Sequence, residues 1–448
     1  MTRDGSPSTT QRPRVRSLGT RLASALARLA LAAWRRPAFA YGLLMALAVG
    51  RLGTTGGELL PGVPSTLVVT LAFFALALWQ RRWTHAWSAW RACAAAFWLY
   101  TLVCLIESVS VLYRGGTPYL PFALGRWSFL AICVTTAAMA EDVDALRDML
   151  SGNAYAAGII GLLTVLHATR VLRLPFALSL MPARTFGPIH MPVPRTLGVA
   201  MSPDKFAMIA ALTLVTIGLT YDQPLPVVRP RWVAALLALL AILACLIAQT
   251  RAVYISILFA LALIVCFRLL ARVRRPWFSG AAGAWAAVLL YALALVAANV
   301  AFSRWVPIEW LDTGTSSSIR NVEIRIEVNA LALQMFRRWP WLGIGHDRFE
   351  PLTLDDNGIH NVFLEQMVAT GLVGGVPYWL FHALILVAAL RACGDRRPAL
   401  AGLGRVLAPA VLVVYLTYQF FPGFLNTPFA VLSGLVAALA RERRRATA

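Results

Sequence analysis

The sequence predicts an all-α polytopic membrane protein with about twelve transmembrane helices. A helical segment between the ninth and tenth transmembrane helices is expected on the side of the membrane opposite the basic termini. Hydrophobic residues make up 59% of the 448-residue chain and charged residues only 14%, whereas a soluble domain carries about 25% charged residues. Apolar runs of spanning length recur along the chain, and arginines gather in the short segments between them. Lipid offers no hydrogen-bond partners to the backbone, whereas a helix satisfies its backbone groups internally. These runs are therefore expected to form helices.

The apolar runs give the expected spans and the division of the chain. A spanning helix needs about 20 mostly apolar residues. We expect spans at about 38–57, 64–80, 87–112, 118–140, 152–170, 199–220, 232–250, 252–271, 280–302, 366–390, 404–420 and 425–440. The chain then consists of a basic tail (1–37), nine helices (38–302), an outside segment (303–366), three helices (367–440) and a second basic tail (441–448). We find no internal repeat and expect no appended soluble domain.

The charge pattern predicts the orientation. The net charge is +21, but a nucleic-acid-binding protein would gather its charge on a polar domain, so nucleic acid is not an expected partner. Arginines between membrane helices instead follow the positive-inside rule, which places both termini in the cytoplasm. The segment 141–148 is the exception, since it has four acidic residues and only Arg147. Acidic residues weigh little in this rule.

Neither a metal nor a cofactor is expected. The six cysteines include no CxxC pair, which argues against a zinc site or a disulfide framework. Asp355 and Asp356 are adjacent in the sequence, and adjacent carboxylates make a poor divalent site. The outside segments contain no DxD motif, and the chain contains no nucleotide-binding motif.

The long outside segment contains an amphipathic helical pattern. Apolar residues recur at Ile324, Val328, Leu331 and Met335, which is the spacing of one helix face. Pro340 ends the pattern, and a glycine-containing turn is expected after it.

A second helix is expected to start near Asn357, with His360 at its N-terminal end. A membrane helix leaves the interface at this point, so the imidazole can reach water while its backbone is fixed. Such a histidine can accept a proton from a hydroxyl near neutral pH.

Several arginines on the outside face have two interpretations. Arg251, at the tip of a helical hairpin, either reaches lipid phosphates as an interfacial residue or binds a diphosphate in bidentate fashion. Arg325 lies beside Glu323 and Glu327, so a surface salt bridge is its alternative role. Arg195 is either an interfacial residue or a substrate-binding one. Arg184 and Arg320 are the other candidate substrate-binding positions on this face.

A charged pair and two histidines within the apolar runs have structural interpretations. Glu107 and Arg126 lie near the outside ends of adjacent spans, and pairing with each other is the expected reason that lipid tolerates them. His167 and His382 are expected to be packed or hydrogen-bonded within the bundle.

Four stretches together resemble the O-antigen ligase family, which is related to O-antigen polymerases. They are RTLGVAMSPDKFA, QTRAVYIS, RIEVNALALQMFRRWPWLGIGHDRF and IHNVFLEQMVATGLVGG, and they cover roughly residues 195–375. Two positions depart from the family pattern: Asp204 stands where asparagine is usual, and Asn329 where an aromatic residue is usual.

The resemblance implies an inverting, metal-independent membrane glycosyltransferase in the bacterial inner membrane, with its active site facing the periplasm and no cofactor. It would transfer polysaccharide from an undecaprenyl diphosphate donor to the lipid A core. Arg251 and Arg325 match the arginines that the family is expected to use to bind the diphosphate. His360 matches the residue expected to act as the base or to orient the acceptor. Arg195 matches a further basic position near that site. The open alternatives are an O-antigen or exopolysaccharide polymerase, a protein O-oligosaccharyltransferase, or a transporter. A transporter would be expected to carry its ionisable residues at the bilayer midplane, on broken helices.

Overall fold

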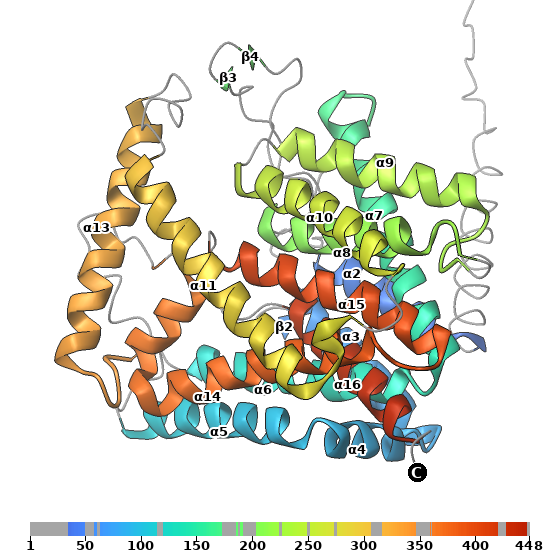
Figure 1. Ribbon diagram of the computed structural model, residues 1–448, viewed down its shortest axis with the longest axis horizontal. Helices are drawn as coiled ribbons and strands as arrows, with labels where there is room; N and C mark the ends of the chain where they lie inside the picture. Colours follow the sequence, from blue (N-terminus) through green and yellow to red (C-terminus); the bar gives the residue numbers. More distant parts are fainter. Residues whose placement is uncertain are drawn as a thin grey trace, which may run out of the picture.

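The computed structural model consists almost entirely of helices (Figure 1). It describes residues 35–49, 58–60, 63–113, 120–172, 185–186, 189–190, 203–223, 226–248, 251–272, 276–305, 316–345, 359, 361–419 and 427–445. Two short antiparallel strand pairs lie among these residues: β1 (Glu58–Leu60) with β2 (Val63–Pro64), and β3 (Thr185–Phe186) with β4 (Ile189–His190).

Every predicted apolar run contains a helix. The first half of the chain contributes α2 (Pro37–Val49), α3 (Ser65–Trp79), α4 (Trp83–Ala92), α5 (Ala94–Tyr113), α6 (Leu120–Met139) and α7 (Val143–Ala168). The second half contributes α8 (Pro203–Thr220), α9 (Arg231–Ala248), α10 (Arg251–Leu270), the 3-10 turn η2 (Trp277–Ser279), α11 (Ala281–Trp305), α13 (Ser316–Arg338), α14 (Val362–Ala392), α15 (Pro398–Thr417) and α16 (Thr427–Arg445). The prediction of an all-helical fold is confirmed.

Five described helices are long and apolar enough to cross a membrane, or six if one bent pair counts as a single span. The protein is therefore a multi-pass helical membrane protein, while the count of about twelve spans stays a prediction. The bent pair is α4 and α5, which meet at 98° and divide the predicted run 87–112. Helix α4 buries Ala86 and Ala89 and exposes Trp83 and Trp87. Exposed tryptophans on a short amphipathic helix are typical of the membrane interface.

Small residues allow α2 and α7 to pack backbone against backbone. A Cβ atom at Gly42 would overlap the carbonyl oxygen of Met149, and one at Gly152 would overlap that of Phe39. Lipid provides no hydrophobic force between helices, so close contact of this kind supplies much of the association energy.

The centre of the bundle is an aromatic cluster around His382. The ring of His382 stacks on Phe429 at 4.6 Å between centroids and lies 4.4 Å from the ring of Tyr378. Its side chain is buried, and its two ring nitrogens have no hydrogen-bond partner among the described residues. His167 is buried at the end of α7. The expectation that both histidines are packed within the bundle is confirmed.

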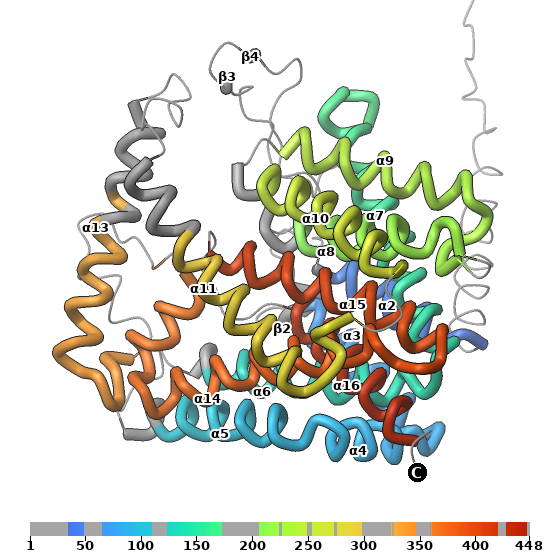
Figure 2. Tube along the Cα trace, viewed as in Figure 1, coloured from blue at the N-terminus to red at the C-terminus, as the bar shows by residue number. Residues whose placement is uncertain are grey.

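The loops predicted to lie inside gather at the end of the bundle that carries the C-terminus (Figures 1 and 2). The buried Arg441 donates hydrogen bonds to the carbonyl oxygens of Ala137, Ala140 and His85 at 3.2, 2.5 and 3.1 Å. It therefore satisfies carbonyl groups at the end of α6, where a cation is favourable to the helix dipole. Arg441 at this end therefore has a structural role in joining α16 to α6 and α4.

The acidic loop that departs from the charge rule also has a structural explanation. Asp142 accepts a hydrogen bond from the amide of Ala145 at 2.7 Å and so caps α7. Glu141 forms an ion pair of 3.2 Å with Arg82 from the preceding inside loop. Asp142 thus stabilises the start of α7, and Glu141 pairs with Arg82.

All four predicted segment boundaries fall inside helices: the boundary at 37/38 lies within α2 and the boundary at 302/303 within α11. The boundary at 366/367 lies within α14, which begins at Val362, and the boundary at 440/441 lies within α16, which continues to Arg445. The difference at 366/367 arises because α14 is bent, so its first residues are not part of the straight span.

Candidate functional site

The tip of the α9–α10 hairpin is held at the bundle end opposite the C-terminus. Arg251 is the first residue of α10. Tyr254, one turn further, donates a hydrogen bond of 2.9 Å to the carbonyl oxygen of Leu246 at the end of α9. The hydroxyl groups of Ser256 and Thr417 lie 3.0 Å apart, which joins α10 to α15. The start of α10 is therefore fixed relative to two neighbouring helices.

Helix α13 confirms the predicted amphipathic helix and lies across the same end of the bundle (Figure 1). Its residues Val328 and Ala332 are buried in a small apolar cluster with Ile359 and Val368. Three further residues of the predicted face, Ile324, Leu331 and Met335, are partly buried there, and so is Phe336. The apolar face therefore packs against the start of α14, and α13 also carries Arg320 and Arg325.

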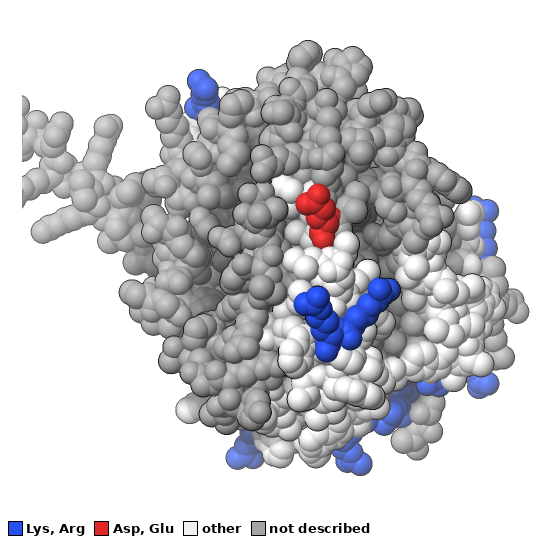
Figure 3. Space-filling view, turned by 90° about the vertical axis from the view of Figure 1, so that its left-hand side faces the viewer, with Lys and Arg blue, Asp and Glu red and all other residues white. Residues whose placement is uncertain are grey.

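The opposite face of α13 is charged and exposed. Glu327 is exposed, and so are Arg337 and Arg338 in the last turn. Figure 3 views this end of the molecule and shows acidic and basic side chains along one strip. The exposed Trp339 and Trp341 follow directly, which is the combination of basic and aromatic residues found at membrane interfaces.

The turn after α13 is inserted into a break in α14. Gly371 has φ +62° and ψ −159°, which interrupts the helix. The amides of Ile344 and Gly345 donate to the carbonyl oxygens of Val368 and Ala369, each at 2.9 Å. In return, Leu372 and Val373 donate to the carbonyl oxygens of Pro340 and Trp341 at 2.7 and 3.1 Å. The turn thus supplies the hydrogen bonds that the broken helix has lost.

Glycine is required on both sides of this insertion. Gly343 has φ +63°, and a Cβ atom there would overlap the backbone of Val368 and Ala369. A Cβ atom at Gly371 would overlap the backbone of Trp341. The PWLGIG turn and the ATGLVGG stretch therefore form one structural unit.

The start of α14 is fixed on both sides of position 360. Ile359 is buried against α13. Asn361 is the N-cap of α14 and accepts hydrogen bonds from the amides of Phe363 and Leu364 at 3.1 and 3.0 Å. Its side-chain amide donates to Oε1 of Gln419 at 2.8 Å. The backbone around position 360 is thus held between α13 and the end of α15.

Part of the chain matches a known protein family. Residues 236–379 match the protein-family model described as O-antigen ligase. These residues belong to the O-antigen ligase family. No curated protein matches the chain. The ligase segment runs from within α9 into α14, so it contains α13, the inserted turn and the break at Gly371. The predicted family resemblance is confirmed for this segment, and with it a function of the O-antigen ligase or polymerase type.

The ligase segment contains four of the six predicted site residues: Arg251, Arg320, Arg325 and His360. The backbone of the three arginines is described, as the first residue of α10 and as two positions on α13. Their side chains lie outside the described residues, as do His360, Arg184 and Arg195. Helix α10, which carries Arg251, contacts the end of α15, and α15 contacts Asn361 beside His360. Helix α13, which carries Arg320 and Arg325, packs on the start of α14.

A buried polar network supports the ligase segment from outside it. The predicted pair is confirmed, with Arg126 Nε lying 3.7 Å from Glu107 Oε1 and both side chains buried. Gln366 completes the network by accepting from Arg126 and donating to Glu107 Oε1 at 3.2 Å. Gln366 Nε2 also lies 3.0 Å from the hydroxyl of Thr370, and Arg126 lies over the ring of Tyr378 at 5.1 Å. The network joins α5 and α6 to both sides of the break in α14.

Sequence reasoning missed Gln366, Asn361 and Gln419 as supporting residues. Each contributes a side-chain amide to a contact between helices distant in sequence. The one signal for Gln366 was its position five residues before the GLVGG stretch. Among the described residues, no group of three His, Cys, Asp or Glu side chains could hold a metal ion.

Proposed function

We propose that this protein is an O-antigen ligase of the bacterial inner membrane, which transfers polysaccharide from undecaprenyl diphosphate to the lipid A core. The observation that carries the proposal is the junction at the end of α15. Thr417 contacts α10 through Ser256, and Gln419 contacts the N-cap of α14 through Asn361. With α13 packed on α14, this junction links the helices that carry Arg251 and Arg325 to the start of α14 beside His360, by way of α15.

In the proposed reaction, a hydroxyl of the core sugar attacks the anomeric carbon of the donor. The new C–O bond forms on the face opposite the leaving group, so the configuration inverts. The bond between the anomeric carbon and the diphosphate oxygen breaks, and its electron pair leaves with undecaprenyl diphosphate. His360 accepts the hydroxyl proton, and the carrier diphosphate is released with the negative charge.

Arg251 and Arg325 are proposed to bind the diphosphate. Negative charge grows on the leaving group in the transition state, and fixed guanidinium groups can stabilise that charge in place of a metal ion. Arg195, Arg184 and Arg320 are proposed to bind other anionic parts of the two substrates. Purified protein should therefore transfer glycan with EDTA present and without ATP; activity that EDTA abolishes and magnesium restores would contradict this mechanism.

The break in α14 bears on the transporter alternative. Broken helices in transporters direct free helix ends at substrate or ions. In α14 the freed groups of Val368, Ala369, Leu372 and Val373 are hydrogen-bonded to the inserted turn. This break therefore joins α14 to the turn that follows α13 and leaves these groups unavailable to a transported substrate. This arrangement favours an enzyme at the membrane interface over a transporter.

A gene deletion separates ligase from polymerase. For a ligase, a lipopolysaccharide gel of the deletion strain should lack long-chain bands while carrier-linked polymer accumulates. Core capped by a single repeat would indicate a polymerase instead, and an unchanged gel would exclude both.

Orientation is tested separately. The proposal requires residues 303–366 to face the periplasm and both termini the cytoplasm. A cysteine placed at Ser316 should react with a membrane-impermeant reagent in intact spheroplasts, and one placed at Ala446 should not. The reverse labelling pattern would contradict the proposed orientation.

A further inference from the structure

A cavity of about 420 Å³ opens at the end of the bundle that carries the C-terminus. Its walls are the junction of α4 and α5, the end of α14 with the loop that follows, and the end of α16. It therefore occupies the space that the 98° bend between α4 and α5 leaves beside α14. Its volume lies within the range of about 300–1,000 Å³ that is typical of ligand sites.

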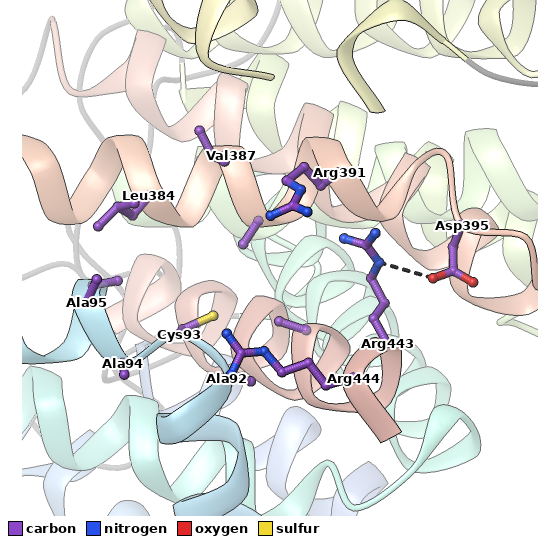
Figure 4. A pocket seen from close by; sticks show the side chains of 13 residues that line it. Ala92, Cys93, Ala94, Ala95, Leu384, Val387, Arg391, Asp395, Arg443 and Arg444 are labelled. Carbon is purple, nitrogen blue, oxygen red and sulfur yellow. Dashed lines mark hydrogen bonds and ion pairs between the residues drawn. The ribbon is translucent and has the colours of Figure 1, made fainter. Parts of the chain in front are cut away.

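The cavity has one apolar side and one basic side (Figure 4). Ala94, Ala95, Leu384 and Val387 line the apolar side. Arg391, Arg443 and Arg444 line the other side and come from two helices, α14 and α16. Figure 4 shows their guanidinium groups gathered around one space. A ligand that fits both sides must combine an anionic group with hydrocarbon.

The basic side carries more positive charge than its one carboxylate can balance. Asp395 is the only acidic residue among those that line the cavity. It pairs with Arg443 at 3.0 Å and with Arg397, outside the lining, at 3.1 Å. Arg444 donates to the carbonyl oxygen of Arg91 at 2.9 Å. Arg391 is exposed, and no described carboxylate forms an ion pair with it.

We propose that this cavity binds an anionic phospholipid from the leaflet on the side of the C-terminus. The headgroup phosphate contacts Arg391, Arg443 and Arg444, and an acyl chain lies along Leu384, Val387 and the first turn of α5. Basic pockets between membrane helices are suited to anionic lipid headgroups, and guanidinium groups bind phosphate oxygens in pairs.

This lipid site is distinct from the proposed transfer site. Arg391 follows Gly371 by 20 residues of helix, a distance of about 30 Å at 1.5 Å per residue. The two sites therefore lie near opposite ends of α14, in contact with different leaflets. The lipid would not be a substrate and would hold the ends of α5, α14 and α16 together.

Native mass spectrometry of the full-length protein in detergent tests the proposal. The probes are phosphatidylglycerol, phosphatidylcholine with the same acyl chains, and inorganic phosphate. We expect phosphatidylglycerol to be retained in preference to phosphatidylcholine, and inorganic phosphate not to be retained. Replacing Arg391, Arg443 and Arg444 together by glutamine should weaken phosphatidylglycerol binding about 100-fold, which corresponds to about 2.8 kcal/mol.

Two single variants separate the cavity from general surface charge. Arg391→Gln should weaken binding about fivefold, since one arginine near a membrane surface contributes about 1 kcal/mol. Ala95→Phe leaves the charge unchanged but fills the apolar side, and it should also weaken binding. The matched control is Arg396→Gln, which removes an exposed arginine that lies in the loop after α14 and does not line the cavity.

Equal binding by Arg391→Gln and Arg396→Gln would overturn the proposal, as would wild-type binding by Ala95→Phe. Retention of both lipids to the same extent would show a purely apolar surface, and binding of inorganic phosphate alone would show a simple anion site; either result would also overturn it. Each variant is first checked for an unchanged elution volume and melting temperature in detergent, so that misfolding is not mistaken for loss of lipid. Glycan transfer is not part of the readout, so failure here leaves the proposed ligase function untouched.

Discussion

The side-chain amide of Asn361 donates a hydrogen bond of 2.8 Å to Oε1 of Gln419, so the residue after His360 is tied to the end of α15. The amide of Val362 also donates to the carbonyl oxygen of Tyr418 at 3.1 Å. Two contacts to one neighbouring helix fix the backbone next to His360. A base acts well only when its position is fixed relative to the proton that it accepts.

Replacing His360 tests the proposed base. We expect His360→Ala to lose transfer by about 10²–10⁴-fold, the usual contribution of a positioned base. Transfer by the wild type should also fall at acidic pH, and that fall should be absent in the variant. His346→Ala and His190→Ala are the matched histidine controls and should retain most activity. A His360→Ala protein with wild-type transfer would remove the catalytic assignment.

The two arginines should act on the donor diphosphate. Arg251→Ala and Arg325→Ala are each expected to lower kcat by about 10²–10³-fold, as loss of one transition-state contact does in other enzymes. Lysine should restore little activity, since it keeps the charge but loses the planar fork. The exposed Arg337→Ala serves as control on the same helix. Normal transfer by both alanine variants at wild-type expression would show that these arginines are only interfacial.

The inserted turn should tolerate no side chain at its contact with α14. Gly371→Ala and Gly343→Ala each force a Cβ atom into neighbouring backbone at positive φ. The backbone strain alone costs about 1–3 kcal/mol, so both variants should melt earlier and lose transfer. Gly280→Ala is the matched control, because nothing lies within 4 Å of its Cβ position. Equal melting temperatures for all three would contradict the insertion.

Removing one partner of the buried pair should destabilise the protein strongly. Arg126→Met leaves Glu107 buried without its cation, which typically costs about 3–5 kcal/mol. The double variant Arg126→Met with Glu107→Leu should recover part of that loss, because no uncompensated charge remains. Reversible unfolding in mixed micelles, analysed as a double-mutant cycle, measures the coupling. Strict additivity of the two single effects would show that the pair does not interact.

Asp395 should give the protein a pH-dependent stability. Burial raises the pKa of Asp395, but hydrogen bonds from the backbone and side chain of Arg397 and from Arg443 outweigh it and leave the pKa below 3.8. The folded state therefore holds the proton less tightly than the unfolded state, and stability is lost as the pH falls. Asp395→Asn should lower the melting temperature at pH 6, and the difference should shrink below about pH 4.

The matched control for Asp395 is Asp222→Asn. Asp222 pairs with Arg268 at 3.0 Å, but both side chains are largely exposed, and such pairs contribute only about 0–1 kcal/mol. The control should therefore change the melting temperature little at any pH. A deficit of Asp395→Asn that stays constant down to pH 3 would contradict the linkage.

The sequence could predict what depends on local pattern. Apolar runs located the helices, and the spacing of Ile324, Val328 and Leu331 located α13. The break at Gly371 was not predictable, because GLVGG reads equally well as small residues within a continuous span. The role of Gln366 was hidden for the same reason: a lone amide in an apolar run does not reveal which distant side chains it contacts.

The candidate site was predictable only as a set of positions. Motif order predicted that Arg251, Arg325 and His360 share one face, and in the structure α15 links α10 to α14, on which α13 packs. These links depend on the contacts between Ser256 and Thr417 and between Asn361 and Gln419, which are separated by 161 and 58 residues. Sequence periodicity contains no information on contacts at such separations.

The break at Gly371 also matches α14 to the thickness of a bilayer. As one straight helix, its 31 residues would be about 46 Å long, well beyond a hydrocarbon core of about 30 Å. The 21 residues from 372 to 392 measure about 31 Å, so the bent helix fills the core without tilting or stretching the lipid. The first residues of α14 then lie outside this straight span.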